Sequence, residues 1–294
     1  MNFRPDTLNN IIGQEEVKKC LEVSISAAKK QQRPLPHILL DGGPGLGKTS
    51  LARILAKEMD VGIQIANGAG CRKIKSILPY VAKTPPGTIL FIDEIHRLTR
   101  MVEEFLYPVL EDFRIDLESG GETTSIHLEP FTIIGATTDS GALSPPLYDR
   151  FILKHHLHLY NIEELSKLIL INSKKISMTV KEDAAKEIAK RSRDTPRVAN
   201  NLLKWLNDYC VAHNISVLSL DIVVSGCNML GVDDKGLDEQ DKRYLSVLSK
   251  THPMGLKTIV ASVGINEETI LTQIEPFLLR HKVIIKMSKG RMLV

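Results

Sequence analysis

A glycine-rich segment near the start of the chain combines residue types that suit the binding of phosphate groups. Residues 42–49 read G-G-P-G-L-G-K-T and match the pattern G-x-x-x-x-G-K-[ST]. The glycines let backbone N–H groups curl around phosphate oxygens, and the helix that follows points the positive end of its dipole at them. The lysine is expected at the β- and γ-phosphates, and the threonine hydroxyl at Mg²⁺. The segment therefore predicts a P-loop. Its expected contacts with ATP and Mg²⁺ are Gly45, Gly47, Lys48, Thr49 and Ser50.

Two acids follow an apolar run further along the chain. Ile89 to Ile92 are apolar, and Asp93 and Glu94 come directly after them. This is a Walker B pattern, in which Asp93 is expected to hold the Mg²⁺ shell and Glu94 to orient or polarise the attacking water. An acidic helix N-terminus is the alternative interpretation of this pair, and the preceding P-loop disfavours it. His96 is expected to be a structural or coupling residue rather than a base.

These motifs need elements to hold them, and the apolar pattern predicts such elements. Short β-rich runs alternate with helical patterns, which is typical of a parallel sheet with helices on both faces. The expected strands are 37–41, 88–93 and 131–135, and the expected helices run over 49–59 and from 102 onward. Residues 114–128 alternate on both sides of Gly120-Gly121, which predicts a β-hairpin.

The second half of the chain has a different organisation. The pattern from 161 to 230 is helical throughout, with Thr195-Pro196 as an expected N-cap and first-turn proline. Residues 231–236 are expected to form a linker. Three short helical patterns follow, and residues 283–294 predict a two-stranded wing. The stretch from Pro276 to the C-terminus has no acid and five basic residues, which are Arg280, Lys282, Lys286, Lys289 and Arg291.

Composition bounds these expectations. The chain has 294 residues, 43% hydrophobic and 25% charged, enough for two or three domains with a sizeable core. Its net charge of +3 does not by itself indicate a nucleic-acid partner. No run of 18 apolar residues and no signal-peptide core is present, so a cytoplasmic protein without membrane contact is expected. The four cysteines form no CxxC pair, which disfavours zinc ribbons and a disulfide framework.

The order of the motifs resembles that of the AAA+ ATPases. The P-loop and Walker B are followed by Gly135-Ala136-Thr137-Thr138, Tyr148-Asp149-Arg150 and Thr195-Pro196-Arg197. Further strings, including Glu111-Asp112-Phe113-Arg114 and 230–238, make the chain similar to the RuvB family of Holliday-junction branch-migration motors over nearly its whole length. The resemblance implies a P-loop AAA+ α/β domain over 1–160, a helical lid over 161–231 and a winged-helix domain over 232–294.

The resemblance also implies roles for residues outside the P-loop. Thr138 resembles sensor 1, within reach of the γ-phosphate, and Arg150 resembles an arginine finger that acts on a neighbouring subunit's ATP. Arg197 resembles sensor 2, which reports the nucleotide state to the lid. The catalytic set implied by the family is Lys48, Asp93, Glu94, Thr138, Arg150 and Arg197. Residues similar to the adenine-side contacts of the family are Phe3, Arg4, Ile12, Tyr160 and Pro196.

The same resemblance implies partners. They are copies of the chain in a hexameric ring, duplex and four-way-junction DNA, a RuvA-like junction-binding protein and a RuvC-like resolvase. Lys286, Lys289 and Arg291 are expected to contact DNA phosphates without reading sequence. A solvated, ligand-free charged hairpin is the alternative interpretation of this stretch.

Three departures from the family pattern bear on these expectations. Gly43 stands where a proline is usual, and Tyr148 stands where a second arginine is usual, which leaves Arg150 as the sole basic residue of its motif. The expected hairpin tip, residues 118–122, is polar and acidic where the family has an apolar tip. Because apolar anchors usually supply interface energy, a RuvA-like partner is expected to bind through other contacts or more weakly.

Two other classes of function are open at this point. A clamp-loader subunit has a similar AAA+ core but usually ends in a helical collar, which the predicted wing disfavours. A DNA-binding assembly protein that uses ATP only as a switch is disfavoured by the complete catalytic set.

Overall fold

The computed structural model describes residues 3–119 and 122–294. The chain divides into two compact units. The first comprises the described residues up to Glu164 together with Thr195–Arg197. The second comprises Leu165–Asp194 and Val198–Val294. In the described part of the chain, no helix is both long and apolar enough to cross a membrane.

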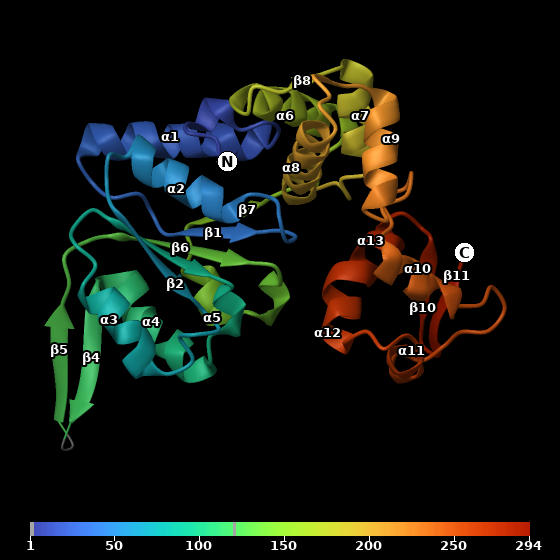
Figure 1. Cartoon of the computed structure of the whole chain (residues 1–294). Coiled ribbons are helices and arrows are strands. Elements are labelled where there is room, and N and C mark those ends of the chain that lie inside the picture. The colour runs from blue at the N-terminus through green and yellow to red at the C-terminus, as the bar shows by residue number, and fades with distance from the viewer. Residues whose placement is uncertain (1–2, 120–121) are drawn as a thin grey trace. The chain divides into compact units, whose positions relative to one another are not determined.

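The first unit is built on a five-stranded parallel sheet (Figure 1). Its strands in spatial order are β2 (Ile63–Asn67), β3 (Ile89–Asp93), β6 (Thr132–Thr137), β1 (Ile38–Asp41) and β7 (Leu153–His156). The sequence pattern predicts β1, β3 and β6, and the structure confirms them. It misses the two edge strands, β2 and β7, because polar residues interrupt their apolar pattern. β3 and β6 are almost wholly buried, as a sheet covered on both faces requires.

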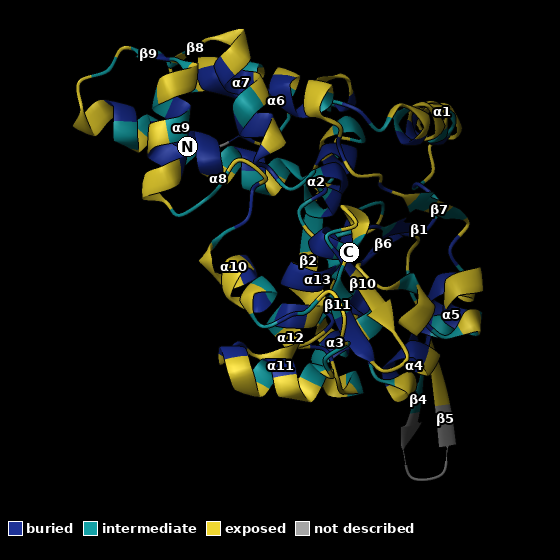
Figure 2. Ribbon diagram, turned by 90° about the vertical axis from the view of Figure 1, so that its right-hand side faces the viewer, coloured by how far each residue is buried: buried dark blue, intermediate teal, exposed yellow. Residues whose placement is uncertain are grey.

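Helices cover both faces of this sheet, as expected (Figure 1). On one face lie α1 (Glu15–Gln31) and α2 (Lys48–Glu58), and on the other lie α3 (Ile74–Ala82), α4 (Arg100–Asp112) and α5 (Pro145–Asp149). Short 3₁₀ turns precede α1 and follow β3 and β6. Each helix buries one stripe and exposes the other, and the outer surface of α1 is exposed in Figure 2. A core of β3, β6, α3, α4 and α5 side chains, including Phe131 and Phe151, fixes the second face.

The predicted hairpin is present and projects away from the sheet (Figure 1). Its strands are β4 (Arg114–Ser119) and β5 (Glu122–His127), in antiparallel register with Arg114 opposite His127. The expected turn at Gly120-Gly121 lies outside the described residues. Phe113 ends α4 in the left-handed conformation, and its carbonyl accepts the N–H of Leu128, so the hairpin is continuous with α4.

The helices expected for the region 161–230 lie mostly in the second unit. They are α6 (Ile162–Lys175), α7 (Glu182–Lys190), α8 (Pro196–Ala212) and α9 (Leu220–Met229). α8 begins at Pro196, as the first-turn proline predicts. A two-stranded parallel pair, β8 (Thr179–Val180) with β9 (Val217–Leu218), ties the connecting loops and is the one departure from an all-helical pattern.

The C-terminal part of the second unit is a winged helix. Its helical segments are α10 (Glu239–Ser246), α11 (Leu256–Val263), α12 (Glu267–Thr269), the π-helical turn η4 (Ile270–Ile274) and α13 (Glu275–Arg280). The wing consists of β10 (Ile284–Met287) and β11 (Gly290–Leu293), and Met254 bridges to β11 at Arg291. A Cβ at Gly290 would lie 2.3 Å from the Met254 carbonyl, so this close approach requires glycine.

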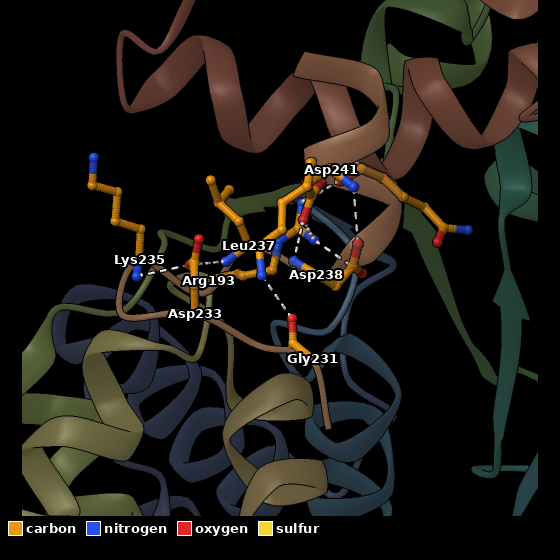
Figure 3. Close-up of polar contacts among 9 residues, drawn as sticks. Arg193, Gly231, Asp233, Lys235, Leu237, Asp238 and Asp241 are labelled. Atoms are coloured by element: carbon orange, nitrogen blue, oxygen red, sulfur yellow. Dashed lines mark hydrogen bonds and ion pairs between the residues drawn. The ribbon is translucent and has the colours of Figure 1, made fainter. Parts of the chain in front are cut away.

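The segment expected as a linker is an ordered turn (Figure 3). The Asp233 carboxylate accepts hydrogen bonds from the backbone N–H groups of Lys235 and Leu237, at 3.0 and 2.8 Å. The Arg191 guanidinium donates to the Val232 carbonyl at 3.1 Å. Beside this turn, Arg193 from the loop before α8 reaches into the winged helix and donates twice to Asp241, at 2.9 and 3.3 Å. The lid and the winged helix are therefore joined by side chains as well as by the chain itself.

Candidate functional site

The carboxyl ends of β1, β3 and β6 bring the predicted nucleotide-binding residues to one edge of the sheet. Parallel strands end on the same edge, so residues far apart in sequence meet there. The P-loop follows β1, the two acids close β3, and Thr138 comes directly after β6. β6 ends at Thr137, two residues later than expected, and Thr138 is exposed at the edge.

The P-loop has the backbone geometry that its glycines permit. Gly42, Gly45 and Gly47 have φ values of 142°, 82° and 101°, which other residues adopt only under strain. Gly43 has no such φ, and a Cβ there would be in ordinary contact with Leu46 at 3.7 Å. The glycine at position 43, where the family usually has proline, therefore does not alter the geometry of the loop.

Lys48 is held inside this loop. Its Nζ donates to the carbonyls of Gly42 and Gly43, at 2.6 and 3.1 Å. Burial lowers the pKa of Lys48, and the nearby carboxylates of Glu94, Asp93 and Asp41 act in the opposite direction. A buried ammonium within a cradle of glycine N–H groups matches the charge and size of a phosphate chain. The residues present therefore fit a nucleoside triphosphate.

The Walker B acids face the polar end of β6. Thr138 Oγ1 donates to the Glu94 carboxylate at 3.1 Å, so the expected sensor and the expected water-orienting acid are in direct contact. Burial raises the pKa of Asp93, and the adjacent Glu94 raises it further. Asp93 and the Thr49 hydroxyl supply oxygen donors of the kind that Mg²⁺ prefers. This donor set fits a magnesium ion that is also held by phosphate oxygens.

His96 takes part in the same network. Its Nδ1 lies 3.0 Å from Thr137 Oγ1 and 3.3 Å from a Glu94 carboxylate oxygen. It therefore connects the Walker B acid to the strand that carries the sensor, which agrees with a coupling role.

Arg197 belongs with the P-loop in the first compact unit. A Cβ at Gly45 would lie 2.9 Å from Arg197 Cβ, so the start of α8 packs directly against the loop. The guanidinium is exposed, and its charge opposes protonation of both Lys48 and Asp93. The structure thus brings the expected sensor 2 to the nucleotide site.

The residues expected on the adenine side differ in burial. Phe3 and Tyr160 are buried, Ile12 and Pro196 are half-buried, and Arg4 is exposed. The Tyr160 hydroxyl is hydrogen-bonded to Gln14, and burial raises the pKa of Tyr160 to about 12. Gln14 also donates to the His158 carbonyl at 2.7 Å and accepts its N–H at 3.0 Å. Sequence reasoning missed Gln14, because its partner His158 is 144 residues away.

A second polar group beside the P-loop was also missed. The Asp41 carboxylate, at the end of β1, accepts from Ser140 Oγ at 3.1 Å and lies 2.9 Å from His156 Nδ1. These contacts join β1, the loop after Thr138 and β7. The aspartate is visible in the sequence directly before the P-loop, but its partners are set by the strand order.

Arg150 lies away from these groups. Its guanidinium donates to the Pro146 carbonyl at 2.7 Å, pairs with Glu111 at 3.1 Å and stacks on the Tyr107 ring at 4.2 Å. These partners belong to α4 and α5, outside the P-loop and Walker B residues. The position is consistent with a finger that acts on another subunit.

The winged helix separates the three expected DNA contacts. Lys286 and Lys289 are exposed on the wing. Arg291 is only 8% exposed, and its guanidinium donates to Glu275 at 2.7 and 3.2 Å. Tyr244 donates to the same carboxylate at 2.9 Å. Because the buried carboxylate holds this cation within the subunit, the contact of Arg291 with DNA stays a prediction.

Comparisons with known proteins agree with this arrangement. Three family descriptions match consecutive parts of the chain: "Holliday junction DNA helicase RuvB P-loop domain" over 3–157, "RuvB AAA lid domain" over 160–233 and "RuvB C-terminal winged helix domain" over 234–294. A "Holliday junction branch migration complex subunit RuvB" from Rhodopirellula baltica is 42% identical over 299 aligned positions, 99% of this chain and 82% of that protein.

Two further relatives extend the comparison. A protein of the same description from Helicobacter pylori strain P12 is 45% identical over 99% of this chain and 88% of its own length. The solved structure described as the Thermotoga maritima RuvB Holliday junction branch migration motor has a TM-score of 0.90 and 38% identity, over 99% of this chain and 95% of that one. The protein therefore belongs to the RuvB family of AAA+ P-loop ATPases.

Proposed function

We propose that this protein is an ATP-driven motor that moves duplex DNA and drives Holliday-junction branch migration in recombination and repair. The observation that carries the proposal is the assembled nucleotide site, in which Lys48, Asp93, Glu94 and Thr138 meet at one sheet edge. Family membership over nearly the whole chain connects this site to a winged helix.

The chain's own residues divide the chemistry among them. Lys48 and the P-loop N–H groups bind the phosphates, while Glu94 accepts a hydrogen bond from the attacking water and polarises it. Thr49 and Asp93 would hold Mg²⁺, which neutralises charge on the β- and γ-phosphate oxygens when bound. Thr138, which donates to Glu94, is proposed to exchange that partner for a γ-phosphate oxygen when ATP binds. Phe3, Arg4, Ile12, Tyr160 and Pro196 are proposed to line the adenine side.

We further propose that the active form is a hexameric ring in which Arg150 completes the neighbouring subunit's site. Within one subunit Arg150 contacts α4 and α5, so it needs a second copy to meet a nucleotide. A heterologous interface repeated around a closed ring supplies one finger to each site. ATPase activity per subunit is therefore expected to rise with protein concentration.

DNA is proposed to run along the wing. Lys286 and Lys289 are exposed and can contact phosphates, which gives affinity without sequence preference. A motor that follows a junction must move along any base sequence, and contacts to phosphates alone allow this. A cytoplasmic location and cooperation with a RuvC-like resolvase complete the proposal.

A RuvA-like protein is the proposed junction-binding partner, and the hairpin β4–β5 is the candidate docking site. Its tip residues Gly120 and Gly121 lie outside the described residues, so the polar tip seen in the sequence stays a prediction. A pull-down with a cognate RuvA should compare the wild type with Gly120→Asp and with a hairpin deletion. Unchanged binding after the deletion would exclude the hairpin as the docking site.

The decisive experiment measures ATP hydrolysis with no DNA, linear duplex and four-way-junction DNA, together with junction displacement. The proposal expects hydrolysis that DNA stimulates and branch migration that requires ATP. Hydrolysis without junction displacement, but with loading of a ring-shaped clamp, would favour the clamp-loader alternative. ATP binding without turnover would favour an assembly switch.

A further inference from the structure

The arginine that we propose as the finger is held by its own subunit in a defined socket. The socket consists of Glu111 and Tyr107 on α4 and the Pro146 carbonyl on α5. Glu111 pairs with one terminal nitrogen at 3.1 Å, and Pro146 accepts from the other at 2.7 Å. The Tyr107 ring lies under the guanidinium plane, 4.2 Å from Cζ.

These contacts fix the plane of the guanidinium and leave part of its donor capacity unused. A guanidinium has five N–H groups, of which each terminal nitrogen carries two. Glu111 and Pro146 each face one terminal nitrogen, so each of those nitrogens keeps a second N–H. The side chain is 21% exposed, so an incoming phosphate can still reach it.

Arg150 Nε is a buried nitrogen without a hydrogen-bond partner among the described residues. A buried unsatisfied donor costs about 1–3 kcal/mol, so something else must stabilise this placement. Glu111 and Tyr107 supply charge pairing and a cation–π contact at the same group. These two contacts therefore hold the guanidinium in one orientation, although that orientation leaves the Nε–H without a hydrogen bond.

A further polar contact connects the socket to the start of α5. The Tyr107 hydroxyl lies 3.1 Å from Ser144 Oγ, and that oxygen caps the first turn of α5. Tyr107 therefore orients both the start of the helix that carries the finger and the finger's guanidinium. Both helices contribute side chains to one buried core, including Leu106 and Val109 of α4 and Leu147 of α5.

We propose that Glu111 and Tyr107 are positioning residues that pre-orient Arg150 for the neighbouring subunit's γ-phosphate. This inference rests on the proposed role of Arg150 as a finger in trans. Charge stabilisation by a finger depends on donors that are already in place when charge develops. Glu111 partly neutralises the positive charge of Arg150. We expect the gain from a guanidinium that is already oriented to outweigh this loss of charge.

The expected kinetic effect follows from where the socket lies. Glu111→Gln removes a charge-assisted hydrogen bond and should lower kcat roughly 10- to 100-fold. The KM for ATP should stay within about twofold, because both residues lie on α4, outside the P-loop and Walker B residues. Tyr107→Leu should lower kcat about tenfold, whereas Tyr107→Phe keeps the ring and should retain most activity. Glu104→Gln is the matched control, since Glu104 is an exposed acid on the same helix that pairs with Arg100 instead.

Mixed rings locate the effect. Glu111→Gln subunits are mixed with Glu94→Gln subunits, each inactive or weak alone. If Glu111 serves the finger of its own subunit, roughly one interface in four of a random ring is intact and activity returns. No recovery, with hexamers verified by size, would overturn the inference, because Glu111 would then act at its own subunit's nucleotide.

A parallel mixture separates this inference from the proposed function. Arg150→Ala mixed with Glu94→Gln tests the finger alone, and its failure would refute the action of Arg150 in trans. Recovery there, combined with wild-type kcat in Glu111→Gln, would leave the finger standing and refute the socket. A second refuting result is a Glu111→Gln, Arg150→Ala double variant whose kcat is markedly lower than that of Arg150→Ala, since residues that act through one group are not additive.

Discussion

The contact between Arg193 and Asp241 offers a quantitative test of how the winged helix is joined to the lid. The Asp241 side chain is fully buried, and its oxygens accept from Arg193 and from the Asp238 backbone N–H at 2.9 Å. Arg193 also donates to the Gln273 carbonyl and stacks on Phe277. Removing the cation by Arg193→Met leaves a buried carboxylate with one remaining donor.

The size of the effect can be bounded from the charge. Removal of one partner of a buried ion pair typically costs about 3–5 kcal/mol. Burial already raises the pKa of Asp241 to about 6 with Arg193 present, so the variant's carboxyl should be protonated at pH 7. With a pKa of about 6, protonating Asp241 in the folded wild type at pH 7 costs only about 1.4 kcal/mol, so the lost Arg193 contacts with Gln273 and Phe277 supply the rest of the penalty. We therefore expect a loss of about 3 kcal/mol at pH 7.

The sign of the pH dependence follows from the same argument. In the variant the folded state keeps a proton on Asp241 that the unfolded state releases, so stability should rise as pH falls from 7 toward 4. The difference from wild type should shrink to about 1.6 kcal/mol at pH 5, because the wild-type Asp241 is also protonated below its pKa of about 6. Adding Asp241→Asn removes the charge, so the double variant should be more stable than Arg193→Met at pH 7 and should lose this pH dependence.

Urea unfolding of the full chain can measure this. Trp205, the chain's single tryptophan, lies in α8 of the same compact unit, and far-UV circular dichroism reports all helices. At a typical slope of about 2 kcal/mol per molar, 3 kcal/mol is a midpoint shift of about 1.5 M. Arg243→Met is the control, because Arg243 donates to the Val263 carbonyl and pairs with no carboxylate among the described residues. Equal losses at pH 5 and pH 7, or a double variant no better than Arg193→Met, would refute the reasoning.

Three further predictions concern the nucleotide site, the core and the wing. Gly45→Ala should raise the KM for ATP at least tenfold in steady-state assays, because its φ of 82° and a Cβ 2.9 Å from Arg197 both oppose a side chain; an unchanged KM would contradict this. Burial lowers the pKa of His37 to about 4, whereas in the unfolded chain it is near 6.5. The free energy of unfolding should therefore be fully retained above pH 6.5 and fall by about 3 kcal/mol as pH falls toward 4. His37→Asn should remove this pH dependence from denaturation curves measured between pH 4 and 7. Lys289→Ala should reduce the slope of log binding constant against log salt concentration for duplex DNA by about one. Arg291→Met should instead reduce the melting temperature of the protein, because it removes the partner of Glu275. A reduced salt slope with an unchanged melting temperature in Arg291→Met would show that Arg291 contacts DNA.

The sequence by itself determined the nucleotide chemistry. The P-loop and Walker B are local patterns, because phosphate binding uses consecutive backbone N–H groups and a carboxylate at a strand end. The apolar runs likewise predicted the central strands, and the proline at position 196 predicted the start of α8. Each of these features depends on residues within a few positions of one another.

Only the tertiary structure decided which charged side chains are exposed to solvent and which are held in ion pairs within the subunit. Arg291 and Lys289 look alike in the sequence, yet Glu275 lies 16 positions from Arg291 and meets it only when α13 packs on the wing. Arg150 meets Glu111, and Asp41 meets His156, through the order of strands and helices. Packing brings these distant residues together, and the high free-energy cost of burying an unpaired charge favours the pairs that form. Neither effect can be predicted from residues that are neighbours in the sequence.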